Sequence, residues 1–599
     1  MSAEVTAEKL ESILGQMSVE EKVGQCFTFG FAGSTIRRRH VEALTKLHCG
    51  GLRLTPAVEH GYGTTDIARP APYLSPGEYT ELLNKLQQIA AERRFSIPLI
   101  MSADQEGDAG GNINRGDVSM FPAAMGLASV PEPDFVYRVH RMVARQLRAY
   151  GINMIHSPVL DVNINPRNPE IGARSYSDRP EEVVRCALQS LKAFHEYDII
   201  ATGKHFPGRG DSDQDAHFSL PSLPFDKKRL NEVELRPFRE LIKAGLDAVM
   251  TAHMRCPALD PTGEPATTSE RMVRGVLRRE LGFDGVVTTD SMAMLGIREL
   301  YGIPEASARA IKAGIDLVLL KAEGDLSQQC YDAVINYVKE GKITEERLNE
   351  SVRRILRLKF SKGIFGRNRF ADPSRTESIT GSAEMKAMAR EAAGKCLLVM
   401  KDDAKRIPIR DRRGILVIEQ IHEFQLPHGG NDKWHHPGYF TERVWEHAPE
   451  ADSVEIEGDV SDKKITECLE RARRARLVLI TDFGSFKTKT AWKVITPLVE
   501  SGHEVIVVTA SPYAPCTVPD GPSFVLTYSA QEESLGPAAE LLFGVGKGLG
   551  RITLSADLTQ KFNRVSYGTE LNKKLFAVES DTTGQPRKMA KITVTSKSG

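Results

Sequence analysis

Apolar runs rich in β-branched residues recur through the first 360 residues, and longer segments with helical periodicity separate them. Because these runs are nearly continuous in apolar residues, they predict strands of a parallel sheet that is covered on both faces. Eight such strands alternating with helices are typical of a (β/α)8 barrel. The predicted strands are VGQCFTFGF (23–31), CGGLRLT (49–55), IPLIMSAD (97–104), GINMIHSPVLDV (151–162), IIATGKHF (199–206), DAVMTAHM (247–254), GVVTTDSM (285–292) and GIDLVLLKA (314–322).

The helical segments between these runs are amphipathic. In TEERLNESVRRILRLKF (344–360), the apolar residues Leu348, Val352, Ile355 and Leu356 recur at helical spacing. Thr344 precedes them and is followed by acidic residues, which predicts a helix N-terminus there.

A second α/β pattern follows a polar stretch without periodicity. Its apolar runs alternate with segments such as KTAWKVITPLVESG and predict a mainly parallel sheet flanked by helices, an α/β sandwich. We therefore expect a barrel over residues 1–365, a linker over 366–385, the α/β sandwich over 386–555 and a loosely packed tail over 556–599. The predicted strands are GKCLLVM (394–400), RGILVIEQ (413–420), ARLVLITDFG (475–484), HEVIVVTAS (503–511) and SFVLTYS (523–529).

Composition narrows the class of protein. The 79 basic and 79 acidic residues balance, which gives no electrostatic reason to expect nucleic acid or an anionic membrane as partner. The eight cysteines are scattered singly, without the spacing of metal or redox sites. With no visible signal peptide and no membrane-length apolar run, we expect a cytoplasmic protein without metal or cofactor. The oligomeric state stays open.

Several of the predicted barrel strands end in polar residues. In a (β/α)8 barrel, the carboxyl ends of the strands form the rim on which catalytic side chains stand. Any one such residue is more simply explained as a buried group that bonds a loop, but a set that converges on one rim favours an active site. These residues are Asp104, Asp161, Lys204, His205, His253 and Asp290.

Asp290 follows a run of β-branched residues directly, which places a carboxylate at the barrel mouth. Such a group can bind metal, orient a histidine or attack an electrophilic carbon; because no cluster with metal-ligand spacing accompanies it, the last two roles lead. Asp215 and His217 lie two residues apart in GKHFPGRGDSDQDAHFSLP (203–221), where the carboxylate would orient the imidazole and favour its protonated form. A carboxylate nucleophile with a separate proton donor fits retaining glycoside hydrolysis.

Four ordered motifs carry a resemblance. KHFPGRGDSDQDAH, DVNINPRNPEIGARSYSDRP, DQEG and GVVTTDSMAM resemble glycoside hydrolase family 3, specifically its β-N-acetylglucosaminidase branch, over residues 10–365 and more faintly beyond. By that resemblance Asp290 matches the nucleophile, His217 the acid/base and Asp215 its orienting partner. The resemblance further implies that the terminal sugar is held by Asp104, Arg174, Lys204 and His205.

The sequence also departs from the family pattern. The segment DQEGDAGGNINRG (104–116) is lengthened, and Arg115 within it is carried over as a sugar contact. A long loop, residues 57–79, follows the second strand, and rim loops set substrate choice. The resemblance implies an exo-acting retaining β-N-acetylhexosaminidase that acts on amino-sugar glycosides.

Two alternatives stay open. One is phosphorolysis, because a histidine acid/base would tolerate phosphate as acceptor, and the other is a non-catalytic sugar-binding protein on the same scaffold.

Overall fold

The computed structural model describes residues 3–59, 69–107, 111–166, 168–214, 216, 219–421, 423–425, 431–433, 437–457, 460–483, 490–516, 520–551 and 554. Its first body is an eight-stranded parallel sheet with strand order β10-β1-β2-β5-β6-β7-β8-β9. The eight strands are β1 (Phe27–Ala32), β2 (Gly51–Thr55), β5 (Ile100–Ala103), β6 (Met154–Ile155), β7 (Ile200–Phe206), β8 (Ala248–Thr251), β9 (Val286–Thr289) and β10 (Val318–Leu320). Each lies within one of the eight apolar runs, so the predicted barrel is confirmed.

The sheet curls until its two edge strands meet. β9 and β10 approach each other through a parallel bridge between Thr288 and Leu317, which brings the ends of the sheet together into a nearly closed barrel. All strands run parallel, so their carboxyl ends gather at one rim and their amino ends at the other.

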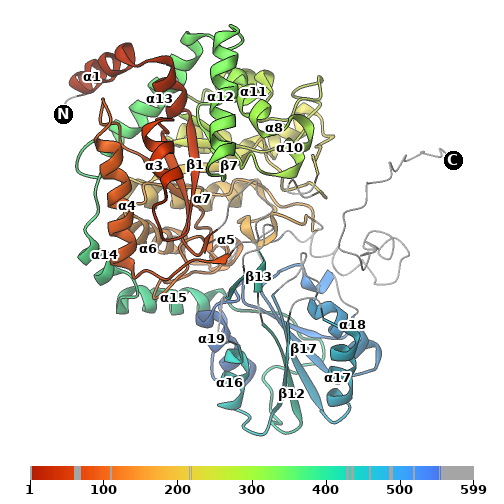
Figure 1. Ribbon diagram of the computed structural model, residues 1–599. Coiled ribbons are helices and arrows are strands. Elements are labelled where there is room, and N and C mark those ends of the chain that lie inside the picture. The colour runs from red at the N-terminus through yellow and green to blue at the C-terminus, as the bar shows by residue number, and fades with distance from the viewer. Residues whose placement is uncertain are drawn as a thin grey trace, which may run out of the picture.

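Helices cover the outside of the barrel (Figure 1). Those that follow the strands are α3 (Arg38–Thr45), α4 (Pro76–Ala91), α5 (Ala124–Ser129), α6 (Phe135–Ala149), α7 (Pro180–Glu196), α8 (Lys227–Glu232), α9 (Leu235–Lys243), the π-helix η3 (Arg271–Glu280), α10 (Leu295–Tyr301), α11 (Ile303–Ala313), α12 (Asp325–Lys339) and α13 (Glu345–Ser361). Two further helices, α1 (Ala3–Gln16) and α2 (Val19–Gln25), precede β1, and both contact α13.

Helix α13 closes the amino-terminal end of the barrel. Its Ile355 and Leu358 join a fully apolar cluster with the first residues of several strands, among them Ile100, Ile200 and Val286. The side chain of Thr344 accepts a hydrogen bond from the backbone of Arg347, as the predicted helix start requires. This end of the barrel is therefore closed by apolar side chains.

The second body is a six-stranded sheet of order β11-β18-β17-β16-β12-β15, parallel except at its β11 edge. Two separate apolar cores flank the sheet, one under α16 and α19 and the other under α17 and α18, which makes it an α/β sandwich. Its elements are β11 (Leu398–Lys401), β12 (Ile415–Gln420), α16 (Tyr439–Trp445), β15 (Asp452–Ile456), α17 (Asp462–Ala472), β16 (Leu477–Asp482), α18 (Thr490–Glu500), β17 (Val505–Thr509), β18 (Ser523–Leu526) and α19 (Glu532–Leu542).

The polar connection between the two bodies is partly helical. Asp372 caps α14 (Pro373–Ile379), which packs on α4 and α6, and α15 (Ala383–Cys396) runs along the barrel toward α19 (Figure 1). The sandwich then sends two tyrosines into the barrel core. Tyr513 contacts a loop after β6, where Asn163 Nδ2 donates a hydrogen bond to the tyrosine hydroxyl at 2.6 Å. The backbone carbonyl of Tyr528 accepts a hydrogen bond from the backbone N–H of Ala123 at 3.0 Å.

Among the described residues, no helix is long and apolar enough to cross a membrane. The expected tail, residues 556–599, lies outside the described residues.

Candidate active site

The carboxyl rim of the barrel gathers most of the residues that the sequence singled out. Asp104 follows β5, Lys204 and His205 lie in β7, and Asp290 follows β9. Arg174 ends a short 3-10 turn, Gly172–Arg174, in the loop between β6 and α7. Alternate strands, β5, β7 and β9, place these side chains around one mouth, so a network of ion pairs can form across it.

Asp104 is the centre of one half of this network. Its Oδ2 accepts from Arg53 Nη2 at 2.5 Å, and its Oδ1 accepts from Lys204 Nζ at 3.0 Å and from His156 Nδ1 at 3.2 Å. Burial alone would raise the pKa of Asp104, but Lys204 and Arg53 outweigh it and hold the pKa well below its ordinary value. The carboxylate is therefore ionised at neutral pH and can accept hydrogen bonds from a ligand.

Glu106 links Asp104 to Arg174. The guanidinium of Arg174 grips Glu106 in two hydrogen bonds, Nε to Oε2 at 2.7 Å and Nη2 to Oε1 at 3.0 Å. Lys204 Nζ forms an ion pair with Glu106 as well as with Asp104. Burial would raise the pKa of Glu106, yet Arg174 and Lys204 lower it. The two parallel hydrogen bonds fix both the orientation and the position of the Arg174 guanidinium.

The second half of the network surrounds Asp290. Its Oδ1 accepts from the backbone N–H of Ser291 at 2.7 Å, while Oδ2 lies 3.4 Å from Arg209 Nη2 and 3.8 Å from His205 Nε2. His253 holds Ser291, the residue after Asp290, because the His253 ring Nε2 forms a hydrogen bond with the Ser291 carbonyl at 3.0 Å. The Asp290 carboxylate is thus held firmly by its backbone side, and 12% of its side chain is exposed at the mouth.

His205 is oriented by the buried carboxylate of Asp161. Its Nδ1 donates to Asp161 Oδ2 at 2.6 Å, and the backbone N–H of Arg209 donates to Oδ1 at 2.7 Å. Burial raises the pKa of Asp161 to about 6 against the opposing effect of Arg209, so this carboxyl is ionised at pH 7. Burial and the nearby Arg209 and Arg174 hold the pKa of His205 well below its ordinary value. The imidazole is therefore neutral, and its Nε2 turns toward Asp290.

The predicted acid/base pair, Asp215 and His217, lies outside the described residues. The residue between them, Ala216, is described, and its backbone N–H donates to Glu170 Oε2 at 3.3 Å. Glu170 also pairs with Arg209, at 2.7 Å between Oε1 and Nη2. The loop that carries the two predicted residues is therefore tied to the same arginine that approaches Asp290.

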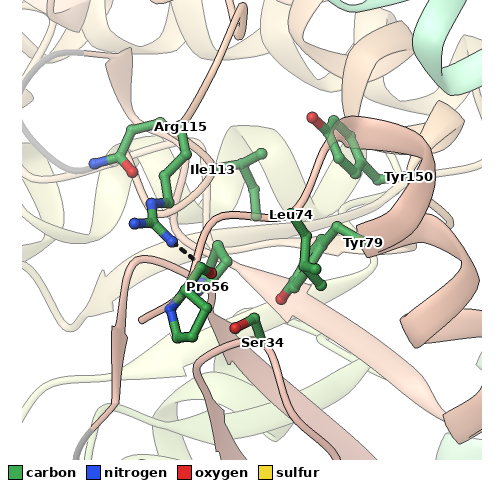
Figure 2. Close-up of a pocket in the computed structure, with 9 residues that line it drawn as sticks. Ser34, Pro56, Leu74, Tyr79, Ile113, Arg115 and Tyr150 are labelled. Carbon is green, nitrogen blue, oxygen red and sulfur yellow. Dashed lines mark hydrogen bonds between the residues drawn. The ribbon is translucent and has the colours of Figure 1, made fainter. Parts of the chain in front are cut away.

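Arg115 is engaged elsewhere. Its guanidinium donates to the carbonyls of Ala71 and Pro72 at 2.8 and 3.1 Å and lies over the ring of Tyr73. Figure 2 shows it beside a small pocket that Tyr79 also lines, between the segments that follow β1, β2 and β5. In the described structure Arg115 thus braces the rim loop that follows β2, and its part in sugar binding stays a prediction.

Several rim residues were not singled out from the sequence: Arg53, Glu106, His156, Glu170, Arg209 and Lys321. Arg53 and Lys321 carry the same signal as the residues that were found, a charged side chain inside or directly after an apolar strand. Glu106 and Arg209 lie in the quoted motifs DQEG and KHFPGRGDSDQDAH. Within the described residues, no group of three or more His, Cys, Asp or Glu side chains is arranged to hold a metal ion.

Comparisons with known proteins agree with this geometry. Residues 18–358 match the glycosyl hydrolase family 3 N terminal domain. A β-hexosaminidase A from Pseudoalteromonas piscicida is 32% identical over 355 residues, which cover 56% of this chain and 58% of that protein. A β-N-acetylglucosaminidase/β-glucosidase from Cellulomonas fimi is 27% identical over 433 residues, covering 70% of this chain and 71% of the relative.

A solved structure extends the likeness to both bodies. The family 3 β-N-acetylglucosaminidase from Paenibacillus sp. str. FPU-7 superimposes with a TM-score of 0.77 at 27% identity, covering 92% of this chain and 100% of the other. The match to the first relative, in contrast, spans less than two thirds of that protein's length. Since the family match covers more than half of the chain and the barrel is shared, this protein belongs to glycosyl hydrolase family 3.

Proposed function

We propose that this protein is a retaining, exo-acting β-N-acetylhexosaminidase that releases β-linked N-acetylglucosamine, or a related hexosamine, from the non-reducing end of a glycoside. Asp290 acts as nucleophile, and His217, oriented by Asp215, acts as acid/base. The observation that carries the proposal is the Asp290 carboxylate, fixed through its Oδ1 at the barrel rim, with Oδ2 turned toward Arg209 and His205. The β-hexosaminidase relatives support the choice of sugar.

The reaction proceeds in two steps. In the first, an Asp290 oxygen forms a bond to the anomeric carbon while the bond to the leaving oxygen breaks, and that oxygen takes the proton of the His217 imidazolium. In the second, neutral His217 removes a proton from water, whose oxygen attacks the anomeric carbon and releases the Asp290 carboxylate. The two inversions restore the β configuration.

The neighbours of Asp290 suit both steps. Arg209 Nη2 and the neutral His205 Nε2 lie 3.4 and 3.8 Å from Asp290 Oδ2, so a cation and a neutral ring face the carboxylate that would attack the anomeric carbon. Asp104, Lys204 and Arg174 would hold the hydroxyls and the 2-acetamido group of the terminal sugar. Their mutual ion pairs fix these side chains before substrate arrives, which reduces the entropy lost on binding.

The test is a panel of nitrophenyl β-glycosides (N-acetylglucosaminide, N-acetylgalactosaminide, glucoside and xyloside), each assayed with and without phosphate. We expect release from the N-acetylglucosaminide, loss of turnover in Asp290→Asn, and the β anomer as first product by proton NMR. The α anomer as first product, or full turnover in Asp290→Asn, would overturn the assignment. Formation of a sugar 1-phosphate only when phosphate is supplied would show that the reaction is phosphorolysis and not hydrolysis. Binding without any product would instead indicate a sugar-binding protein.

A further inference from the structure

Lys321 stands at the rim without a partner of its own. It follows β10 directly, and its ammonium makes no hydrogen bond to any residue that the structure describes. The nearest carboxylate oxygen is Asp104 Oδ2, at 4.0 Å. Of its side chain 22% is exposed, and the charges of Asp104 and Asp290 both act on its ammonium.

Asp104 does not need Lys321 as a counter-ion. Both of its oxygens already accept short hydrogen bonds, from Arg53 on one side and from Lys204 and His156 on the other. A buried or half-buried ammonium without acceptors is unfavourable, because it has lost part of its hydration. The fold therefore holds a charged donor in place whose hydrogen bonds are unused within the described chain, which is typical of a group that meets a ligand.

We propose that Lys321 is a substrate-binding residue that donates a hydrogen bond to a hydroxyl of the terminal sugar, and that the same hydroxyl donates to Asp104. The separation of 4.0 Å between Lys321 Nζ and Asp104 Oδ2 leaves room for one oxygen within hydrogen-bond distance of both. The inference rests on the site of the proposed function and adds a determinant of which sugar that site accepts.

The charges of the rim favour a neutral hydroxyl over an anionic substituent. With Lys321 counted as charged, the described carboxylates and cations of the rim are equal in number, so no excess positive charge remains to attract an acid group. The carboxylates are Asp104, Glu106, Asp161, Glu170 and Asp290, and the cations are Arg53, Arg174, Lys204, Arg209 and Lys321.

The surroundings of Lys321 also make its contribution depend on pH. Burial, together with the cations Arg53 and Lys204, lowers the pKa of Lys321 to about 8 against the opposing effect of Asp104 and Asp290. The ammonium is charged below this value and loses its proton above it. Sugar affinity should therefore be full at pH 7 and decline as the pH rises through about 8.

Calorimetric binding of N-acetylglucosamine provides the test, with Lys321→Met compared against the wild type. Lys312→Met serves as matched control, because Lys312 is exposed on α11. Loss of a hydrogen bond from a charged donor predicts at least about a tenfold weaker affinity in Lys321→Met at pH 7. The wild-type affinity should fall above pH 8, while that of Lys321→Met stays flat. Melting temperatures of both variants show whether each is folded.

Deoxy analogues of the sugar identify the hydroxyl. With one of the 3-, 4- and 6-deoxy sugars, the wild type and Lys321→Met should bind equally, because the shared hydroxyl is missing. Equal affinity of the folded variant for the parent sugar, or the same decline above pH 8 in both proteins, would overturn the inference. A wild type that binds none of these sugars would instead contradict the proposed function.

Discussion

The two ends of the barrel both bury ionised side chains, but they use them differently. At the amino end, Asp316 is fully buried, and both of its oxygens are occupied. Oδ2 accepts from Arg278 at 2.5 Å and from the backbone of Val287 at 3.0 Å, and Oδ1 accepts from Ser351 at 2.8 Å and Arg354 at 3.2 Å. Every member of this cluster has a partner supplied by the fold.

At the carboxyl end, the partners are less complete. Lys321 has no hydrogen bond within the described chain, and Asp104 Oδ2 lies 4.0 Å from its ammonium. Buried polar atoms without a protein partner among the described residues also occur here, at Nε of Arg53 and at Nε and Nη1 of Arg209. The comparison teaches that a completed ion cluster stabilises the fold, whereas an incomplete one on the same scaffold marks a site for a ligand.

The largest effect should come from Asp290→Asn. Removal of the proposed nucleophile is expected to lower kcat by about 10⁴-fold, because an amide oxygen is a poor nucleophile. The melting temperature should change little, because the contact to the Ser291 backbone can be kept by the Asn side-chain oxygen. Steady-state kinetics and thermal unfolding of the same preparation check both parts. A strongly destabilised but active variant would contradict the comparison.

Asp316→Asn should give the reverse pattern. The substitution removes the buried charge that pairs with Arg278, Arg347 and Arg354 and should lower the free energy of unfolding by about 3–5 kcal/mol. At temperatures where the variant is folded, KM and kcat should match the wild type, since the site is at the opposite end. Denaturant unfolding and kinetics at low temperature measure the two quantities. Altered KM in a folded variant would mean that the two ends are coupled.

The two ends should also differ in their response to pH. The pKa of Asp161 is raised to about 6, so the folded chain binds a proton that the unfolded chain releases near pH 4. Asp161 therefore contributes stability below about pH 4, and this contribution is lost as the pH rises through 6. For Asp316, burial is outweighed by Arg278 and Arg347, and the lowered pKa gives stability at neutral pH that is lost on acidification below about pH 4.

Asp161→Asn isolates the first of these contributions. The difference in unfolding free energy between wild type and variant should change between pH 4 and 6.5 by at most about 3 kcal/mol, in favour of the wild type at the acidic end. Thermal unfolding across this range measures it. A difference that stays constant with pH would show that Asp161 titrates at its ordinary value.

The smallest effect is expected at α13, the helix that bears several members of the Asp316 cluster. Thr344→Ala removes the side-chain cap of α13, which bears Arg347, Ser351 and Arg354, and should lower the free energy of unfolding by about 1 kcal/mol. Turnover should be unchanged. Thr344→Ser keeps the capping oxygen and is the matched control for the loss measured by chemical unfolding.

The barrel could be predicted because all eight strands are buried on both faces, which leaves continuous apolar runs in the sequence. β15 was missed because it is an edge strand whose exposed and buried residues alternate, with polar side chains outward. Helix α14 was missed for a related reason: it is two turns long, and its Thr376 and Ile379 pack on barrel helices instead of forming a long apolar face.

The site was predictable where a charged residue ends a strand, as at Asp104 and Asp290. The ion pairs themselves were not, because the contact between Glu106 and Arg174 joins residues 68 positions apart and depends on the folded rim. The roles assigned by resemblance to Asp215 and His217 stay predictions, since both lie outside the described residues.

Tyr513 of the second body, whose hydroxyl accepts a hydrogen bond from Asn163, affects the order in which the chain folds during synthesis. Asn163 Oδ1 accepts from the backbone of Gly172, two residues before Arg174, so Tyr513 supports the loop between Asp161 and Arg174. Domains fold in order as a nascent chain emerges, and the barrel leaves the ribosome about 150 residues before this support. The loop that carries Arg174 should therefore reach its final position last, when the sandwich docks on a barrel that has already formed.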